Sequence, residues 1–392
     1  MPHKVKTGLD VIEKAWPRYL ADTQVGLVVH PSSINCRFEH ASDICLRSRR
    51  FVVKAFFGPQ HGVQGETQDN MVEWEGFQDE KTGLPVYSLY GKTRKPGPSM
   101  LKDLDAIVVD LQDAGARYYT FIWTLSLIME ACRDLMKVVV VLDRPNPIGG
   151  HIFEGPVLVP KYKSFVGLHK LPVRHGMTIG EIAIYLKDLF YQDLDLHIIP
   201  LEGWKREMWF DDTGLPWVLP SPNMPTVDTA TVYPGMCLLE GTNLSEGRGT
   251  TRPFEIFGAP FINPEVLIKK LSAIRLPGVM FRPIHFLPTF QKFSGEVCGG
   301  AQIHVVDREI YKPFKTAVAV IKTVYELYPG DFSWKKPPYE YEEVLPPIDI
   351  LAGTDRLRKD IEDCVNLGDM ESWWEAKARA FDKKIRRRYL LY

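Results

Sequence analysis

The chain has 392 residues, 45% of them hydrophobic and 25% charged, which is the composition of an ordinary globular protein of two or three domains. There are 48 Lys and Arg residues and 49 Asp and Glu residues, so the net charge of -1 gives no field that would select nucleic acid or an anionic membrane. The longest aliphatic run, Val138–Leu142, is far shorter than the ~20 residues that span a bilayer.

The termini and the cysteines indicate a compartment. No apolar stretch follows the first six residues, so we expect no signal peptide and a cytoplasmic location. The 6 cysteines are scattered through apolar surroundings and form no C-x-x-C pair. This pattern predicts free buried thiols in a reducing environment rather than disulfides.

The first half of the chain alternates short strands with helices. The β-rich runs are Gln24–Val29, Phe51–Phe57, Ala106–Leu111, Lys137–Leu142 and Leu196–Pro200. Two helical stretches between them are Thr120–Leu135 and Thr178–Leu189, the second opening with a T-x-x-E capping box. The alternation predicts an α/β fold, a Rossmann-like parallel sheet with right-handed crossovers.

The pattern changes at Trp217–Pro234, where closely spaced prolines disfavour both a helix and a central strand. We place a domain boundary here, which gives a Rossmann-like domain over 1–228 and a smaller α+β domain over 229–392. The second domain is predicted to mix strands with helices. The strand segment is Ala301–Val306, and the helical segments are Pro264–Ile274, Tyr311–Leu327, Thr354–Cys364 and Glu371–Arg388.

Several enzyme classes are disfavoured because their motifs are missing. No G-x-G-x-x-G follows the first strand, and the Gly-Lys-Thr at 91–93 lacks the P-loop glycine, since position 86 is Val86. No G-x-S-x-G, no H-E-x-x-H and no metal-ligand spacing of the histidines is present. We therefore expect no nucleotide cofactor and no metal.

Polar or glycine-rich loops follow each of the first four strands, starting at His30, Gly58, Asp110 and Asp143. Ligands of open α/β sheets bind at this edge, so we expect the loops to converge on one crevice, with the loop Glu240–Thr251 closing over it. Each feature also has a structural interpretation: Asp110 and Asp143 can cap helices, and His61 and His175 can hold turns. Asp143 and Arg144, like Glu246 and Arg248, can form ion pairs with each other.

The side chains in these loops suit a sugar with an acidic substituent. Aromatic rings (Trp74, Tyr118, Tyr119, Trp123) stack on sugar faces, and arginine forks bind carboxylates. A phosphosugar fits this inventory nearly as well.

The chain resembles the exo-β-N-acetylmuramidase (NamZ-like) family. The matching stretches run in family order: Gly58–Gly62, Thr82–Gly91, Asp110–Thr120, Leu142–Pro147, Arg174–Glu181, Ser221–Thr226 and Glu240–Thr251. The resemblance implies a Rossmann-like first domain that carries the active site and a second domain whose loops extend it. It also implies hydrolytic release of N-acetylmuramic acid from the non-reducing ends of peptidoglycan fragments, a step of cell-wall recycling, on a muropeptide or disaccharide substrate.

The chain departs from the family at one position that matters for chemistry. The family usually has Pro-Glu-His-Gly, and its glutamate is the leading catalytic candidate, but this chain has Gln60. A family arginine is likewise replaced by Gln64. Glutamine cannot donate a proton near neutral pH. Another carboxylate (Glu66, Glu73, Asp113 or Glu246) then serves, or the substrate acetamido group acts as nucleophile, or the protein is a silent glycan binder or a hydrolase of another amino sugar.

The candidate site residues follow from the resemblance and from the convergence of the loops. The candidate catalytic residues are Gln60, His61, Asp113 and Glu246. The candidate substrate-binding residues are His30, Ser32, Arg117, Tyr119, Asp143, Arg144, Asn146, His175, Asn223, Thr242, Asn243 and Arg248. We expect Arg248 to bind the lactyl carboxylate, with Arg117 as the second choice, because a buried carboxylate needs a paired cation.

Overall fold

The computed structural model of the chain describes residues 5–68 and 71–392. Its large domain is built on a seven-stranded sheet in the order β3-β4-β2-β1-β5-β6-β7. All neighbours are parallel except β3 and β4, which are antiparallel. The strands are β1 (Thr23–Val28), β2 (Phe51–Gly58), β3 (Phe77–Gln78), β4 (Pro85–Ser88), β5 (Ala106–Val109), β6 (Val138–Leu142) and β7 (Leu196–Ile199).

The five strands predicted in the first half are confirmed, and they run parallel. The strands β3 and β4, at one end of the sheet, were not predicted, because two and four residues carry too little periodicity to be recognised. β1 is central, with β2 on one side and β5 on the other. The register pairs Val28 with both Phe57 and Val109, so the loops after β1, β2 and β5 start side by side.

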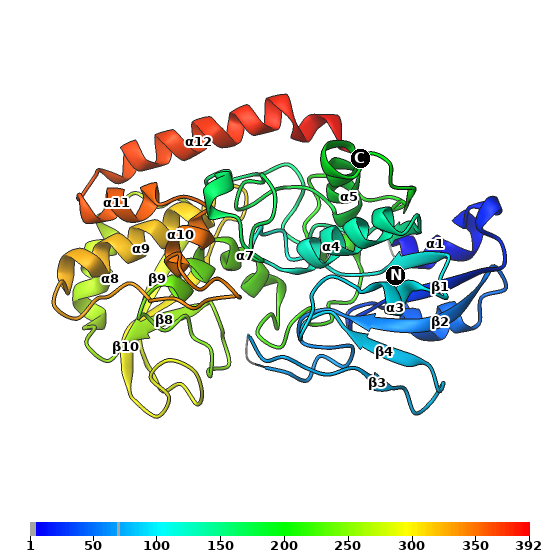
Figure 1. Cartoon of the computed structure of the whole chain (residues 1–392). Helices are drawn as coiled ribbons and strands as arrows, with labels where there is room; N and C mark the ends of the chain where they lie inside the picture. Colours follow the sequence, from blue (N-terminus) through cyan, green and yellow to red (C-terminus); the bar gives the residue numbers. More distant parts are fainter. Residues whose placement is uncertain (1–4, 69–70) are drawn as a thin grey trace.

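Helices cover both faces of the large sheet (Figure 1). Val25, Leu27 and Val108 pack with α1 (Gly8–Ala15) and α2 (Ala41–Leu46) on one face. The alternate residues of the same strands pack with α4 (Phe121–Asp134) and α5 (Ile179–Phe190) on the other. The predicted capping box of α5 is present, since the Thr178 hydroxyl accepts from the Glu181 amide. The short helices α3 (Pro98–Leu101) and α6 (Phe210–Thr213) lie in connections.

A smaller region is built on an antiparallel sheet in the order β8-β10-β9, with β8 (Ile256–Ala259), β9 (Val279–Phe286) and β10 (Cys298–Val305). Its helices are α7 (Val227–Met236), α8 (Pro264–Ser272), α9 (Pro313–Leu327), α10 (Pro347–Ala352), α11 (Arg356–Glu362) and α12 (Leu367–Lys384). One hydrophobic core runs from Ile122 in the large domain to Val318 in the smaller region.

The prediction against helix over Trp217–Pro234 was wrong in its second half, where α7 begins at Val227 and includes Pro234. The Thr226 hydroxyl caps this helix by accepting from the Thr229 amide. Pro234 stands in the last turn and has no N–H to donate to the carbonyl four residues earlier, so the helix lacks that hydrogen bond and ends two residues later, at Met236.

Helix α12 crosses the molecule and brings the chain end back to the large domain beside α5 (Figure 1). The Tyr392 hydroxyl donates to Asp143 Oδ2 (2.7 Å), and Arg386 donates to the carbonyls of Gly150 and Gly176. The predicted second domain, 229–392, therefore also supplies part of the packing around the large sheet. All 6 cysteines are free, and none of the described helices has the length and apolar character of a membrane span.

Candidate functional site

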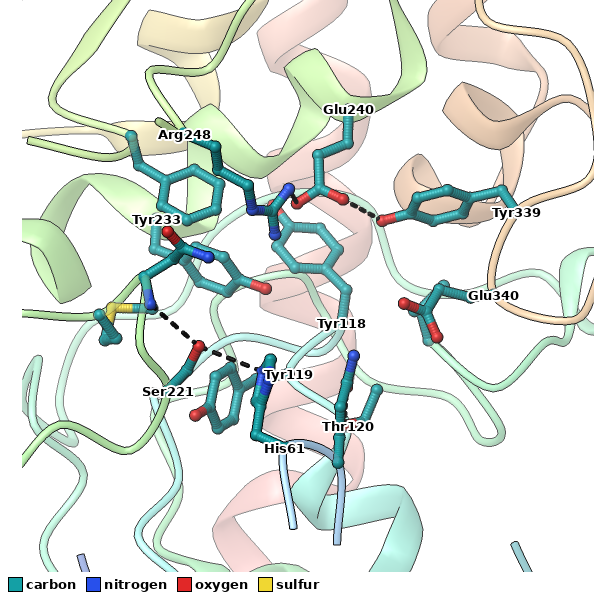
Figure 2. Close-up of a pocket in the computed structure, with 15 residues that line it drawn as sticks. His61, Tyr118, Tyr119, Thr120, Ser221, Tyr233, Glu240, Arg248, Tyr339 and Glu340 are labelled. Atoms are coloured by element: carbon teal, nitrogen blue, oxygen red, sulfur yellow. Dashed lines mark hydrogen bonds and ion pairs between the residues drawn. The ribbon is translucent and has the colours of Figure 1, made fainter. Parts of the chain in front are cut away.

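A cavity lies where the strand ends of the large domain meet the smaller region. Its lining comes from the loops after β2 and β5, the proline-rich segment, α7 and two loops of the smaller region (Figure 2). The lining residues are Gln60, His61, Tyr118, Tyr119, Thr120, Val166, Ser221, Asn223, Met224, Tyr233, Glu240, Arg248, Phe254, Tyr339 and Glu340. Five predicted site residues are among them: Gln60, His61, Tyr119, Asn223 and Arg248.

Gln60 is held with its amide in one orientation. The Thr120 hydroxyl donates to Gln60 Oε1 (2.7 Å), and Gln60 Nε2 donates to the Tyr90 hydroxyl (3.1 Å). Tyr90 in turn donates to Glu340 Oε2 (2.9 Å), and the Gln60 amide also hydrogen-bonds Glu340. The side chain that replaces the expected glutamate therefore points its N–H groups toward a different glutamate.

His61 follows Gln60 and has a left-handed backbone, with φ of 70°. Its Nδ1 lies 2.6 Å from the Thr67 carbonyl, so Nδ1 carries the proton, and Nε2 faces the Ser221 hydroxyl at 3.2 Å. Asn223, two residues after Ser221, donates to the Gln68 carbonyl (2.7 Å). The histidine thus presents an acceptor nitrogen toward the proline-rich segment.

Glu340 is the buried carboxyl group of the cavity that sequence reasoning missed. Burial raises the pKa of Glu340 to about 7, against the hydrogen bonds from Tyr90 and Gln60, which lower it. Glu340 and Tyr341 have φ of 45° and 66°, and Tyr339 and Glu342 exchange two backbone hydrogen bonds of 2.9 Å around them. Positive φ at both central positions is the requirement of a type I′ turn, which normally selects Asn-Gly.

An ion pair lies opposite, at the loop that begins at Glu240 (Figure 2). Arg248 contacts Glu240 Oε1 (2.9 Å) and Glu246 Oε1 (3.1 Å), and Tyr339 donates to Glu240 Oε2 (2.6 Å). Burial lowers the pKa of Arg248, but the two carboxylates more than offset it and raise that pKa overall. This corner of the cavity carries the guanidinium that was predicted to bind a carboxylate.

Aromatic rings form a wall of the cavity. Tyr233 packs edge-on against Tyr118, Tyr119 and Phe254. The hydroxyls of Tyr118 and Tyr119 donate to backbone carbonyls of the segment 220–234. These bonds orient the rings of Tyr118 and Tyr119.

Glu246 lies outside the cavity lining and is held ionised. Burial raises its pKa, but Lys292 (3.0 Å) and Arg248 more than compensate and lower it to about 2. Asp113 is also outside the lining, and its Oδ2 lies 3.2 Å from His175 Nε2 and accepts from the Gly115 amide. Neither Glu246 nor Asp113 belongs to the lining that contains Gln60 and His61.

Other predicted residues at the strand ends bind the protein itself. Asp143 accepts from Thr178 and the Gly180 amide and so caps α5, and burial raises its pKa to about 6. Arg144 pairs with Asp110 (2.5 Å), and Asn146 donates to the Met177 carbonyl.

The fully buried Arg117 donates to three backbone carbonyls, those of Pro156, Leu171 and Leu351, at 2.7 to 2.9 Å. It does not line the cavity. The arrangement matches a structural arginine rather than the second-choice carboxylate ligand.

The remaining predicted residues do not line the cavity either. His30 Nδ1 is 3.3 Å from the Ser32 hydroxyl, and burial lowers the pKa of His30 well below its usual value. The Thr242 hydroxyl donates to the Leu239 carbonyl, and Asn243 donates to the Asp331 carbonyl, so both support the loop.

A second, open groove of about 510 Å³ adjoins the cavity at Glu340, which lines both. Arg94 stacks over the Tyr341 ring at 3.7 Å and lies near Phe165 at 5.7 Å. The groove is lined by Lys92, Thr93, Arg94, Lys95, Leu127, Lys163, Ser164, Phe165, Leu168, Glu340, Tyr341 and Glu342. Over residues 5–68 and 71–392, no cluster of three or more His, Cys, Asp or Glu side chains is arranged to hold a metal ion.

The missed residues Tyr339 and Glu340 left a weak signal in the sequence. The run Tyr339-Glu340-Tyr341-Glu342 follows two prolines and matches neither a strand nor an amphipathic helix. Three residues that line the cavity, His61, Phe254 and Glu340, have positive φ although they carry a Cβ atom. That conformation is visible in the backbone and not in the sequence.

Two family models match successive parts of the chain. Residues 25–228 match the N-terminal part of exo-β-N-acetylmuramidase NamZ, and residues 231–392 match its C-terminal part. The peptidoglycan β-N-acetylmuramidase NamZ of Bacillus subtilis (strain 168) is 45% identical over 389 residues, which are 99% of this chain and 92% of that protein.

Solved structures of two DUF1343 family proteins from Bacteroides fragilis NCTC 9343 are also similar. The first is 35% identical with a TM-score of 0.89 and 100% coverage of both chains. The second is 30% identical with a TM-score of 0.76 and 99% coverage of both. With both halves matched in order and a relative 45% identical over nearly its whole length, the chain belongs to the exo-β-N-acetylmuramidase NamZ family.

Proposed function

We propose that this protein is a glycosidase that releases N-acetylmuramic acid from the non-reducing ends of peptidoglycan fragments. The observation that carries the proposal is the cavity itself, which combines the carboxyl groups Glu240 and Glu340 with Arg248 and an aromatic wall. Glycoside hydrolysis in most families uses two carboxyl groups. The family membership and the name of the Bacillus subtilis relative support the same reaction.

Arg248 is the residue we assign to the lactyl carboxylate that distinguishes muramic acid from glucosamine. Its side chain is 9% exposed, and its Nε has no hydrogen-bond partner among the described residues. A planar guanidinium can bind a carboxylate through two N–H groups, which an ammonium cannot reproduce. Glu240 and Glu246 already balance part of its charge, so a substrate carboxylate has to compete with them.

The cavity is tight, with a volume of about 40 Å³. At about 10–15 Å³ for each water centre, this space holds a few water molecules and not a sugar ring. The side chains that line the cavity therefore have to move apart when the sugar binds. The groove beyond Glu340 is open enough for the rest of the fragment.

The proposal is tested with the disaccharide N-acetylmuramyl-β-1,4-N-acetylglucosamine beside chitobiose, which lacks the lactyl group. We expect release of N-acetylmuramic acid, detected by mass spectrometry, no cleavage of chitobiose, and unchanged activity after dialysis against a chelator. Arg248→Lys should lower kcat/KM for the first substrate about tenfold or more. Equal cleavage of both substrates would favour a hydrolase of another amino sugar, and binding without cleavage would favour a silent binder.

A further inference from the structure

Glu340 lies at the boundary between the narrow cavity and the larger groove. We propose that Glu340 is the general acid that protonates the glycosidic oxygen, with Gln60 and Tyr90 as its positioning residues. The proposal rests on the proposed function above. It assigns a catalytic group to a turn that the sequence motifs do not include.

The position of Glu340 is the first argument. The bond that breaks joins the sugar held in the cavity to the part that leaves, so the donor of the proton has to face both spaces. Glu340 lines the cavity together with Gln60 and Arg248, and it lines the groove together with Arg94 and Tyr341. None of the other carboxyl groups in the cavity lining is part of the groove lining.

The partners of Glu340 are the second argument. Among the described residues it forms no ion pair, and its hydrogen bonds come from the neutral Tyr90 hydroxyl and the neutral Gln60 amide. Burial therefore dominates and raises the pKa of Glu340 to about 7, which keeps much of the group protonated near neutrality. Glu240, by contrast, contacts Arg248 directly.

The charged and titratable groups around Glu340 act in both directions. Glu240 raises its pKa, and Arg248 lowers it. Tyr90, Tyr339 and Tyr341 face it as neutral phenols, because burial raises the pKa of each. On the groove side the charged residues are Lys92, Arg94, Lys95, Lys163 and Glu342.

The backbone is the third argument. Glu340 and Tyr341 occupy the central positions of a tight turn with positive φ, which is unfavourable for residues with a Cβ atom. Such conformations persist where the surrounding structure enforces them, and they concentrate at functional sites. Here the turn delivers one carboxyl group between Tyr90 and the cavity.

The step balances without a cofactor. Glu340 gives its proton to the bridging oxygen, the C1–O bond breaks with its electron pair on that oxygen, and the leaving saccharide departs with a new hydroxyl group. Water supplies the hydroxyl at C1 and loses one proton, which restores the protonation of Glu340 over the cycle. The net reaction is addition of one water molecule across the bond.

The leaving group provides the test. Nitrophenolate departs without a proton, whereas a sugar alkoxide needs one. Glu340→Gln should therefore lower kcat/KM about 10²–10⁴-fold on the muramyl disaccharide and less than about tenfold on 4-nitrophenyl N-acetyl-β-muramide. The exposed Glu343→Gln, three positions along the same loop, is the matched control and should leave both rates unchanged.

The pH profile gives a second readout that a structural role would not move. Wild-type activity on the disaccharide should fall as the pH rises through about 7, since Glu340 then loses its proton. Tyr90→Phe removes a donor to the carboxylate, so the pKa rises and the basic limb moves to higher pH. This variant decides the matter if Glu340→Gln fails to fold.

The outcomes separate the two proposals. Equal losses on both substrates by a folded Glu340→Gln, or an unmoved basic limb in Tyr90→Phe, would overturn the role of Glu340 while the muramidase assignment stands. No release of N-acetylmuramic acid by the wild-type protein from either substrate would overturn the function, and the role of Glu340 with it.

Discussion

The hydrogen-bond partners of Gln60 could not be identified from the sequence motif that contains it. Its place after β2 was predictable, because strand ends of parallel sheets converge. Its partner Glu340 was not predictable, because Glu340 lies in a turn 280 residues later that belongs to no strand or helix. A glutamine that donates to a carboxyl group, and accepts from Thr120, is a positioning element rather than a lost acid.

Gln60→Glu tests this interpretation. Gln60→Glu would place a second carboxyl group beside Glu340. Repulsion between the two negative charges raises the pKa at which the pair loses its last proton, so one proton stays on the pair to higher pH. We expect a rate change of less than about tenfold at pH 7 on the muramyl disaccharide, and a basic limb shifted to higher pH. The control Gln64→Glu adds the same charge at an exposed position four residues after Gln60, and it should change neither the rate at pH 7 nor the basic limb. A gain of several orders of magnitude would mean that the wild-type chain lacks its acid.

The strand-end residues illustrate the limit of composition. Asp143, Arg144 and Asn146 occupy the predicted edge of the sheet, but their polar atoms satisfy the amides of α5, Asp110 and a backbone carbonyl. Polar side chains such as Asp and Asn bind the free backbone N–H groups at the start of a helix, and the same side chains bind the hydroxyl groups of a sugar. A single sequence therefore places such residues correctly without deciding which of the two they serve.

At the scale of elements, helix α9 depends on a buried acid from the large domain. The carboxylate oxygens of Glu154 accept from the amides of Phe314 (3.0 Å) and Lys315 (2.9 Å) in its first turn. Burial raises the pKa of Glu154 to about 7 against these two bonds. The helix was predictable from its apolar spacing, but its cap, 160 residues earlier in the chain, was not.

Glu154→Gln should lower the free energy of unfolding by about 1–3 kcal/mol, because the amide N–H₂ faces a backbone N–H and one hydrogen bond is lost. The folded protein also binds the Glu154 proton more tightly than the unfolded chain, so wild-type stability should decline as pH rises from about 5 to 7. The variant should show a shallower decline in urea titrations over this range. The exposed Glu207→Gln serves as the control, and an identical pH slope in both variants would contradict the assignment.

At the scale of the whole molecule, Arg117 joins the two parts of the chain. Its guanidinium reaches the carbonyls of Pro156 and Leu171 in the large domain and that of Leu351 at the end of α10. The sequence placed this arginine in the polar loop after β5 but could not show that its guanidinium donates to backbone oxygens. Those oxygens come from segments up to 234 residues away.

Arg117→Lys should therefore lower the stability of the fold and leave substrate binding unchanged. The compact ammonium group of lysine cannot reach all three carbonyls that the planar guanidinium of Arg117 binds. Each buried carbonyl left without a donor costs about 1–3 kcal/mol. We expect a clearly lower Tm with KM for the muramyl disaccharide unchanged, compared with the exposed Arg18→Lys. A raised KM at unchanged Tm would restore Arg117 as a carboxylate ligand.

The return of α12 to the large domain has a consequence for biosynthesis. Asp143 directly follows β6, yet its partner, the Tyr392 hydroxyl, is encoded 249 residues later. At about 5–20 residues per second, the ribosome needs roughly 12 to 50 seconds to supply it. During that interval the sheet and α5 can assemble, but Asp143 lacks the hydrogen bond from Tyr392. The packing of the large domain is therefore completed only after the smaller region has been translated.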